Sequence, residues 1–223
     1  MRLYDFPASP HCLKVRAVAH ELGVDLDIVE VNILRGESRS RDFERLNPNG
    51  LVPVLVVGDF VLWESNAILT YLASTHRSRA LQPTDALERA NVDRWLHWQS
   101  AHLGPAVSRV AFERLVKPLT KQSPTDHVAA ARAVDDFETC CGVLEVSLGG
   151  REYVASRLSV ADFAIACILS TAATVELGVE AFPRTKAWLG RILARESVRR
   201  AVAEAEVAMC RMARDEIACL APS

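Results

Sequence analysis

Apolar and polar positions follow two different patterns along this chain, and the change falls near residue 76. Before it, short runs with the two-residue period of strands alternate with runs of helical period. The expected strands are 2–6, 26–32, 53–57 and 60–63, and the expected helices are 10–22, 40–46 and 65–75. A strand–helix–strand unit followed by a helix, a hairpin and a helix predicts a small mixed sheet with helices packed on it.

Residues with strong positional preferences mark the ends of these elements. Gly23 is suited to end the first helix, and Ser40 is suited to cap the second. Gly58-Asp59 separates two short apolar runs, which predicts a β-hairpin. The turn chemistry therefore agrees with the periodicity throughout the first part of the chain.

Beyond residue 86 the apolar positions have only a helical period. Pro105 should bend or interrupt the first of these helices, expected over 87–115, because proline lacks the amide hydrogen that a helix needs. The next helix is expected to begin with Ser123 as its cap and Pro124 in its first position, and Ser159 with Asp162 forms a capping box before a third.

Two further helices are expected, one opened by Pro183 and one capped by Ser197. No strand pattern follows residue 63. The chain therefore divides into an α/β domain over 1–76, a polar linker over 77–86 and an all-α bundle over 87–223.

Composition and charge exclude several classes of partner and site. The 223 residues carry a formal net charge of −2, with a pI of about 6.3, so no nucleic acid or anionic membrane is expected as the main partner. No apolar run reaches the roughly 20 residues needed to cross a bilayer, and no signal-peptide pattern is present, which predicts a cytoplasmic protein. The six cysteines show neither C-x-x-C nor zinc-like spacing, so no metal is expected.

Ser9 lies between the first strand and the first helix, followed by Pro10. A helix N-terminus offers N–H groups and a partial positive charge, which favour a bound anion. In thioredoxin-like redox proteins this place holds C-x-x-C, whereas here Cys12 stands alone and cannot run a two-thiol cycle unaided. A serine hydroxyl can instead donate to a thiolate on a substrate and lower the pKa of that thiol. The alternative is a plain helix cap.

Two further turns offer polar contacts. Val52-Pro53 opens the third strand and is compatible with a cis bond that leaves the main chain of Val52 open to an extended peptide. An ordinary trans opener is the alternative. At Glu64-Ser65, Ser65 as a helix cap suits a carboxylate and Glu64 suits an amino group, the two charges of an α-amino acid. The alternative is a simple cap beside a solvated acid.

In order and spacing these segments resemble cytosolic glutathione S-transferases, in particular serine-type theta, delta and phi-like bacterial forms. The matching stretches are LYDFPASPHC, RLNPNGLVPVL and LWESNAILTYLA, then RANVDRWLHWQ, SVADFAIA and FPRTKAWLGRILARESVRRA. The resemblance implies a thioredoxin-like βαβαββα domain followed by an all-helical bundle, in a homodimer. It also implies conjugation of glutathione, a co-substrate, to small hydrophobic electrophiles, with no tightly bound cofactor.

The family's roles carry over to matching residues. Ser9 corresponds to the group that activates the thiol of glutathione. Val52 corresponds to the residue whose main chain pairs with the cysteinyl part, and Pro53 to its cis proline. Glu64 and Ser65 correspond to the pair that holds the γ-glutamyl head group.

Some positions depart from the family pattern. Relatives have a histidine where this chain has Ser38 or Gly50, and a glutamine where it has Leu51. At position 39 this chain has an arginine where relatives also have a basic residue, and Arg39 is expected to reach the glycyl carboxylate. Glutathione binding is thus expected to involve Arg39 and Leu51 as well. The glycyl end of glutathione is expected to have fewer binding residues than the γ-glutamyl end.

The electrophile is expected beside the long helix that follows the linker. The candidate contacts are His11, His102, Arg109 and Phe112, with ordinary packing or surface as the alternative for each. The sequence does not resolve this second pocket. A glutathione-dependent peroxidase, dehalogenase or isomerase using the same thiolate therefore stays open, as does a non-catalytic binding protein on the same fold.

Overall fold

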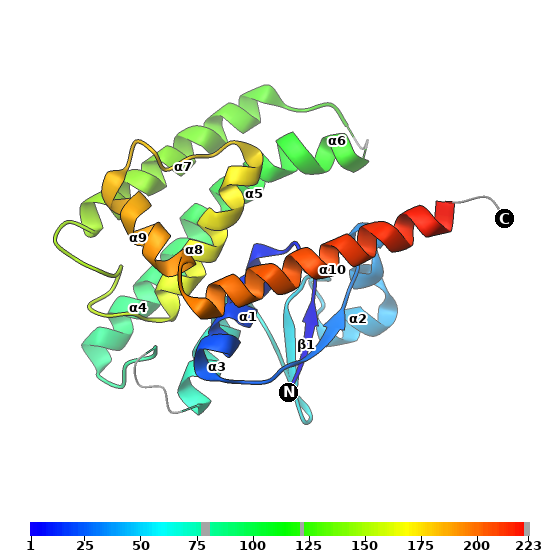
Figure 1. Ribbon diagram of the computed structural model, residues 1–223, viewed down its shortest axis with the longest axis horizontal. Helices are drawn as coiled ribbons and strands as arrows, with labels where there is room; N and C mark the ends of the chain where they lie inside the picture. The colour runs from blue at the N-terminus through cyan, green and yellow to red at the C-terminus, as the bar shows by residue number, and fades with distance from the viewer. Residues whose placement is uncertain (77–80, 121–122, 221–223) are drawn as a thin grey trace. The chain divides into compact units, whose positions relative to one another are not determined.

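The computed structural model describes residues 1–76, 81–120 and 123–220, with side chains in these ranges except 119–120 and 213–220. The chain forms two compact units, residues 1–77 with 195–223, and residues 78–194 (Figure 1). The last helix thus groups with the first unit, whereas the division expected from the sequence placed it in the second.

The first unit is built on a four-stranded sheet of order β2-β1-β3-β4. Its strands are β1 (Arg2–Asp5), β2 (Asp27–Glu30), β3 (Val54–Val57) and β4 (Phe60–Trp63). The pairing of β1 with β2 is parallel, and β3 is antiparallel to both β1 and β4. The helices are α1 (Pro10–Leu22), α2 (Arg41–Leu46) and α3 (Ser65–Thr75). The predicted βαβαββα order is confirmed.

Opposite faces of the sheet pack against different helices. Tyr4 and Val54 lie in one apolar cluster with Phe43 of α2, and the rings of Tyr4 and Phe43 meet edge to face at 6.0 Å between centroids. Side chains alternate along a strand, so the fully buried Leu3 and Leu55 belong to the other face. There α1 and α3 pack against each other.

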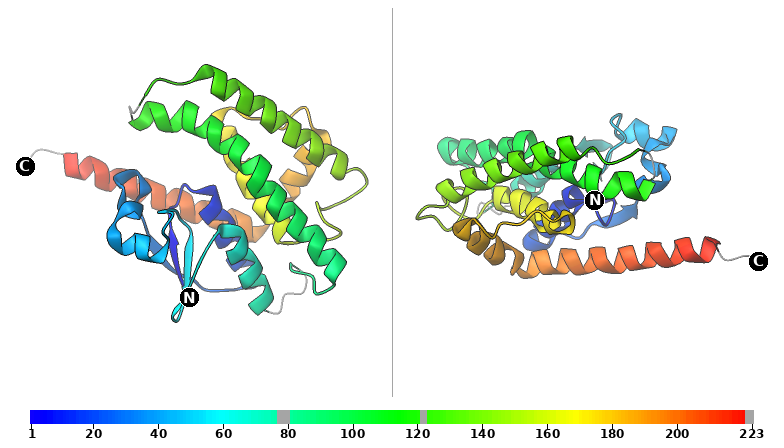
Figure 2. Two further views of the ribbon diagram at one scale, coloured as in Figure 1. Left: turned by 180° about the vertical axis from the view of Figure 1, so that it is seen from behind. Right: turned by 90° about the horizontal axis from the view of Figure 1, so that it is seen from above.

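The last helix, α10 (Glu196–Leu220), runs beside α1 (Figures 1 and 2). Glu21 of α1 forms an ion pair with Arg195 and accepts a hydrogen bond from Ser197 Oγ at 2.5 Å. His20 Nε2 lies 2.7 Å from Glu204 Oε2. Ser197, expected as a helix cap, is therefore inside the helix and holds it to α1 instead.

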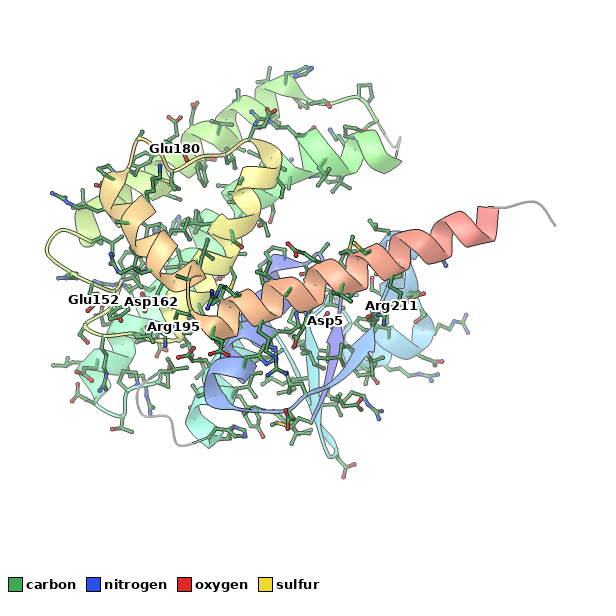
Figure 3. All side chains as sticks on the ribbon, in the orientation of Figure 1. Asp5, Glu152, Asp162, Glu180, Arg195 and Arg211 are labelled. Carbon is green, nitrogen blue, oxygen red and sulfur yellow. The ribbon has the colours of Figure 1, made fainter. Side chains whose placement is uncertain are left out.

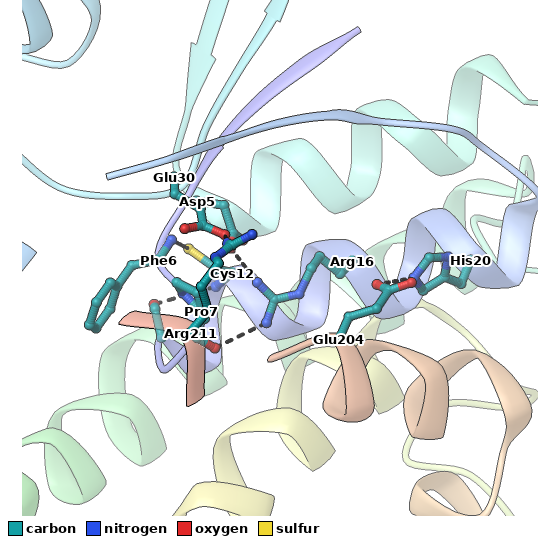
Figure 4. A network of polar contacts seen from close by, with 10 residues as sticks. Asp5, Phe6, Pro7, Cys12, Arg16, His20, Glu30, Glu204 and Arg211 are labelled. Carbon is teal, nitrogen blue, oxygen red and sulfur yellow. Dashed lines mark hydrogen bonds and ion pairs between the residues drawn. The ribbon is translucent and has the colours of Figure 1, made fainter. Parts of the chain in front are cut away.

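Figure 4 shows an ion pair between two buried side chains, Arg16 and Asp5. Arg16 of α1 pairs with Asp5 of β1 and donates from Nη2 to the carbonyl of Pro7 at 3.1 Å. Burial raises the pKa of Asp5, and the charge and hydrogen bond of Arg16 oppose that rise. The pair ties the end of β1 to α1, immediately before Ser9.

The second unit is helical in its described residues. Helix α4 (Ala86–Trp98) passes through a π-helical turn, Gln99–Leu103, into α5 (Gly104–Ala111), then through a second π-helical turn, Phe112–Val116, into α6 (Lys117–Thr120). The others are α7 (His127–Ser147), α8 (Val160–Ala172) and α9 (Pro183–Leu193). Figure 2 shows α5 and α7 side by side. Within the described parts of both units, no helix is long and apolar enough to cross a membrane.

The predicted interruption at Pro105 is confirmed, because the wide π-helical turn ends just before it. A proline cannot donate the hydrogen bond that would close an ordinary helical turn, and a wider turn accommodates the missing donor.

The start of α7 differs from the prediction. Asp126 is the cap and accepts two N–H groups of the first turn, so the assignment of Ser123 as cap and Pro124 as first residue is wrong. The reason is tertiary: buried Glu113 accepts the N–H of Asp126 through Oε2 at 2.8 Å and fixes the chain at that point.

Candidate functional site

One end of the sheet gathers three candidate segments. Because β3 is antiparallel to both β1 and β4, the end of β1, the start of β3 and the end of β4 lie at the same end of the sheet. The segments at these three places are the start of α1, the turn at Val52-Pro53 and the start of α3.

The hydroxyl of Ser9 is the first candidate group. Ser9 caps α1, with Oγ accepting the N–H of Cys12 at 3.4 Å and Pro10 in the first turn. This bond uses a lone pair of Oγ and leaves the O–H hydrogen to be donated, so capping and donation to an anion are compatible. Cys12 is fully buried and burial raises the pKa of its thiol, so it is a packing residue.

The turn before β3 is the second candidate group. The Val52–Pro53 peptide bond is cis. The register of β3 begins at Val54, so the main chain of Val52 lies beyond the paired part of the strand. Buried Asn47 shapes the loop by donating from its side-chain amide to the carbonyl of Leu51 at 2.6 Å. This geometry suits an extended peptide that adds to the end of the strand.

Arg39 reaches the same loop. Its Nη1 donates to the carbonyl of Asn49 at 2.9 Å, and a Cβ on Gly50 would lie only 2.5 Å from that nitrogen. Gly50 also has φ +62°, a conformation that favours glycine. Glycine at position 50 therefore provides the space in which the Arg39 guanidinium lies, next to the exposed Leu51.

The turn from β4 into α3 is the third candidate group. Glu64 has φ 70° and ψ 107°, a strained backbone of a kind that costs about 1–3 kcal/mol and concentrates at functional sites. It occupies the cap position without a capping hydrogen bond, and Ser65 is the first helical residue. The helix has the expected bounds, but the expectation that Ser65 caps it is wrong, because Ser65 already lies in its first turn and Glu64 occupies the cap position.

The starts of α1 and α3 are in direct contact. Ser65 Oγ lies 3.4 Å from Nδ1 of His11. Burial, and then the charge of Lys14, lower the pKa of His11 to about 4, so its ring is neutral at physiological pH. Lys14 is 1% exposed and donates from Nζ to Asn66 Oδ1 at 2.6 Å. His11 therefore belongs to the Ser65 turn of the first unit.

The other three electrophile candidates lie in the second unit. His102 and Arg109 line one cavity of about 560 Å³ between α5 and α7, together with Arg132 and Asp136. Phe112 is not among its lining residues; its ring lies 5.5 Å from the ammonium of Lys117. The structure therefore brings His102 and Arg109 together and leaves Phe112 apart. In the described residues, no group of three or more His, Cys, Asp and Glu side chains is placed to hold a metal ion.

Known proteins are similar to this chain over most of its length. The family model described as "Glutathione S-transferase, N-terminal domain" matches residues 1–74, and "Glutathione S-transferase, C-terminal domain" matches residues 105–196. Glutathione S-transferase 3 of Zea mays is 35% identical over 209 residues, which cover 91% of this chain and 93% of that protein. The chain belongs to the glutathione S-transferase family.

Other members of the family are similar in sequence and fold. Glutathione S-transferase D7 of Drosophila melanogaster is 30% identical, over 84% of this chain and 81% of its own. A glutathione transferase of Phanerochaete chrysosporium, solved with oxidized glutathione, is 27% identical and superposes with a TM-score of 0.86 over 94% of this chain and 96% of its own. The α/β and all-α organisation of this glutathione S-transferase is therefore that of solved members.

Three residues of the site region were given no role of their own from the sequence. Lys14 and Asn66 meet through a tertiary contact between α1 and α3, whereas Asn47 bonds within its own loop. The sequence contains only weak indications of these contacts. Lys14 stands in an apolar helix, and Asn47 begins an Asn-Pro-Asn-Gly run that is typical of turns.

Proposed function

We propose that this glutathione S-transferase binds glutathione along one end of the sheet and conjugates its sulfur to a small hydrophobic electrophile. In this proposal Glu64 pairs with the γ-glutamyl ammonium, and Ser65 with the first N–H groups of α3 holds the adjacent carboxylate. The main chain of Val52 pairs with the cysteinyl residue, next to Pro53 and Leu51. Arg39 takes the glycyl carboxylate.

Ser9 is assigned the chemical role. A free thiol has a pKa of about 8.5 and is mostly protonated near neutral pH. Donation from Ser9 Oγ–H to the sulfur, at the positive end of α1, stabilises the thiolate and lowers that pKa. The thiolate then forms a carbon–sulfur bond with the electrophile, and the leaving group departs with its electron pair.

The observation that carries the proposal is the placement of the three segments. The Ser9 hydroxyl, the cis Val52–Pro53 turn and the strained Glu64 turn come from three separate stretches of sequence and meet at one end of one sheet. Together they provide a donor for a thiolate, a free strand end for a peptide and two groups for an α-amino acid head.

Two measurements test the proposal. Calorimetry should show glutathione binding in the micromolar to millimolar range, and mixing with an aryl halide should release one halide ion per conjugate formed. Absence of binding at millimolar glutathione would point to a binding protein of another specificity. Binding without conjugation would favour peroxidase, dehalogenase or isomerase chemistry on the same thiolate.

The Gly50→Ala variant is expected to weaken glutathione binding about ten-fold, because its Cβ would displace the Arg39 guanidinium from the glycyl carboxylate. Affinity for γ-glutamylcysteine, which lacks that carboxylate, should change far less. Gly58→Ala is the matched control, since Gly58 also has a positive φ, +59°, but a Cβ added there would meet nothing within 4 Å. If Gly50→Ala lost the same affinity for glutathione and for γ-glutamylcysteine, Arg39 would not be a ligand of the glycyl carboxylate.

The proposal also covers the oligomeric state, the residues that contact the electrophile and the location of the protein in the cell. The homodimer and the cytoplasmic location are proposed from the family. The electrophile contacts of His11, His102, Arg109 and Phe112 stay predictions. His102 with Arg109 has the stronger support, because these two side chains line one cavity.

A further inference from the structure

Lys14 is a buried cation on the face of α1 that packs against α3. Its side chain is 1% exposed, and Cys12, Leu13 and Val15 around it in sequence are buried as well. Removing an ammonium group from water is costly unless its surroundings compensate. One compensating contact is the 2.6 Å hydrogen bond from Nζ to Asn66 Oδ1.

Asn66 places that cation under the first turn of α3. It directly follows Ser65, and Ser65 is preceded by the strained Glu64. His11 and Lys14 stand three residues apart on α1, and so on one side of that helix. His11 contacts Ser65 and Lys14 contacts Asn66, so two side chains of α1 hold two successive residues of α3.

The same arrangement adds charge to the helix start. The first N–H groups of α3 already carry a partial positive charge, and the Lys14 ammonium stands directly beside the second residue of that helix. Its field reaches the neighbouring turn, because the charge of Lys14 is one of the two causes that lower the pKa of His11. A field that disfavours a cation at His11 favours an anion at Ser65.

We propose that Lys14 is a positioning residue that holds the Ser65–Asn66 turn and makes it selective for a ligand carboxylate. This inference rests on the proposed function, in which the γ-glutamyl carboxylate lies at Ser65. Lys14 acts through Asn66 and through its charge, without touching the reacting sulfur. It adds to the binding of the α-amino acid head rather than to thiol activation.

Lys14→Met tests the proposal, because methionine fills similar space without the charge. Calorimetry at low ionic strength should show glutathione binding weakened about ten-fold, the size of one charge interaction across roughly 12 Å at an effective dielectric constant near 20. An analogue whose γ-glutamyl carboxylate is replaced by hydrogen should lose less than about two-fold. The pKa of the bound glutathione thiol, read from thiolate absorbance, should stay near its value in the unsubstituted protein.

Asn66→Asp provides a second variant that keeps the lysine. An aspartate in the first turn of a helix supports folding, and it neutralises the ammonium in place, so glutathione should again bind about ten-fold more weakly. Arg2→Met is the matched control for loss of one positive charge, because Arg2 is exposed at the far end of β1 and pairs with Asp27. It should bind glutathione like the unsubstituted protein.

The outcomes separate this proposal from the proposed function. Failure of the unsubstituted protein to bind glutathione would overturn both. If that protein binds glutathione while Lys14→Met and Asn66→Asp bind it unchanged, the role of Lys14 is refuted and the proposed function stands. Equal weakening of both peptides by Lys14→Met would also refute it, since selectivity for the carboxylate is what the proposal requires.

Discussion

Replacing Ser9 with alanine is expected to lower the rate of glutathione conjugation at neutral pH by roughly one to two orders of magnitude. Loss of one hydrogen bond to a charged sulfur removes about 1.5–3 kcal/mol of thiolate stabilisation, which corresponds to roughly one to two units in the thiol pKa. The deficit should shrink above the free thiol pKa of about 8.5, where glutathione ionises unaided.

The dependence of the conjugation rate on pH reports ionisation of the glutathione thiol, because His11 does not titrate in the same range. Its pKa of about 4 keeps the ring neutral between pH 6 and 8, so a rate change in that range reports the sulfur. Stopped-flow absorbance of the bound thiolate gives the pKa directly. Turnover that is unchanged by Ser9→Ala across the whole pH range would remove Ser9 from the chemistry.

Ser40→Ala separates thiol activation from helix capping. Ser40 caps α2 as Ser9 caps α1, with Oγ accepting the N–H of Phe43 at 3.3 Å. Each variant loses a cap, at a cost of about 0.5–2 kcal/mol in unfolding free energy. Only Ser9→Ala should raise the pKa of the bound thiol. A similar rise in both variants would mean that Ser9 acts through the helix rather than through the sulfur.

Local sequence determined most of the first unit. Gly23 ends α1 in a left-handed conformation, Ser40 caps α2, and Gly58-Asp59 joins β3 to β4, all as predicted. These outcomes depend on neighbouring residues alone, through turn conformation and capping. The same rules predicted that Pro105 would interrupt the long helix.

Two of the wrong cap assignments, those of Ser123 and Ser197, share a physical cause. Asp126 rather than Ser123 caps α7 because Glu113 binds its N–H, and Ser197 bonds to Glu21 rather than to its own helix. Lys14 is buried because Asn66 lies opposite it in the folded chain. In each case a partner distant in sequence decides between local alternatives of similar energy, and single-sequence patterns do not contain that partner. The candidate site was predictable as three turns, but the contacts that join them were not.

Substitution of Asp162 in the second unit is expected to destabilise the fold strongly. This side chain is fully buried and is labelled in Figure 3. Oδ2 accepts from the N–H and the hydroxyl of Ser159 at 2.9 and 3.2 Å, which confirms the predicted capping box. Oδ1 accepts from the N–H of Val154 and from Trp188 Nε1, both at 3.0 Å. One carboxylate thus joins the start of α8 to a loop and to α9.

Asp162→Ala should lower the unfolding free energy by about 3–5 kcal/mol, because each buried donor left without a partner costs about 1–3 kcal/mol. Urea denaturation followed by fluorescence measures the change. Asp126→Ala is the matched control, since Asp126 also caps a helix through two N–H groups but is exposed, and it should cost only about 1 kcal/mol. Trp188→Phe removes a single donor and should fall between the two. Equal losses for Asp162→Ala and Asp126→Ala would show that Asp162 acts only as a cap, and that its bonds to Val154 and Trp188 contribute nothing measurable.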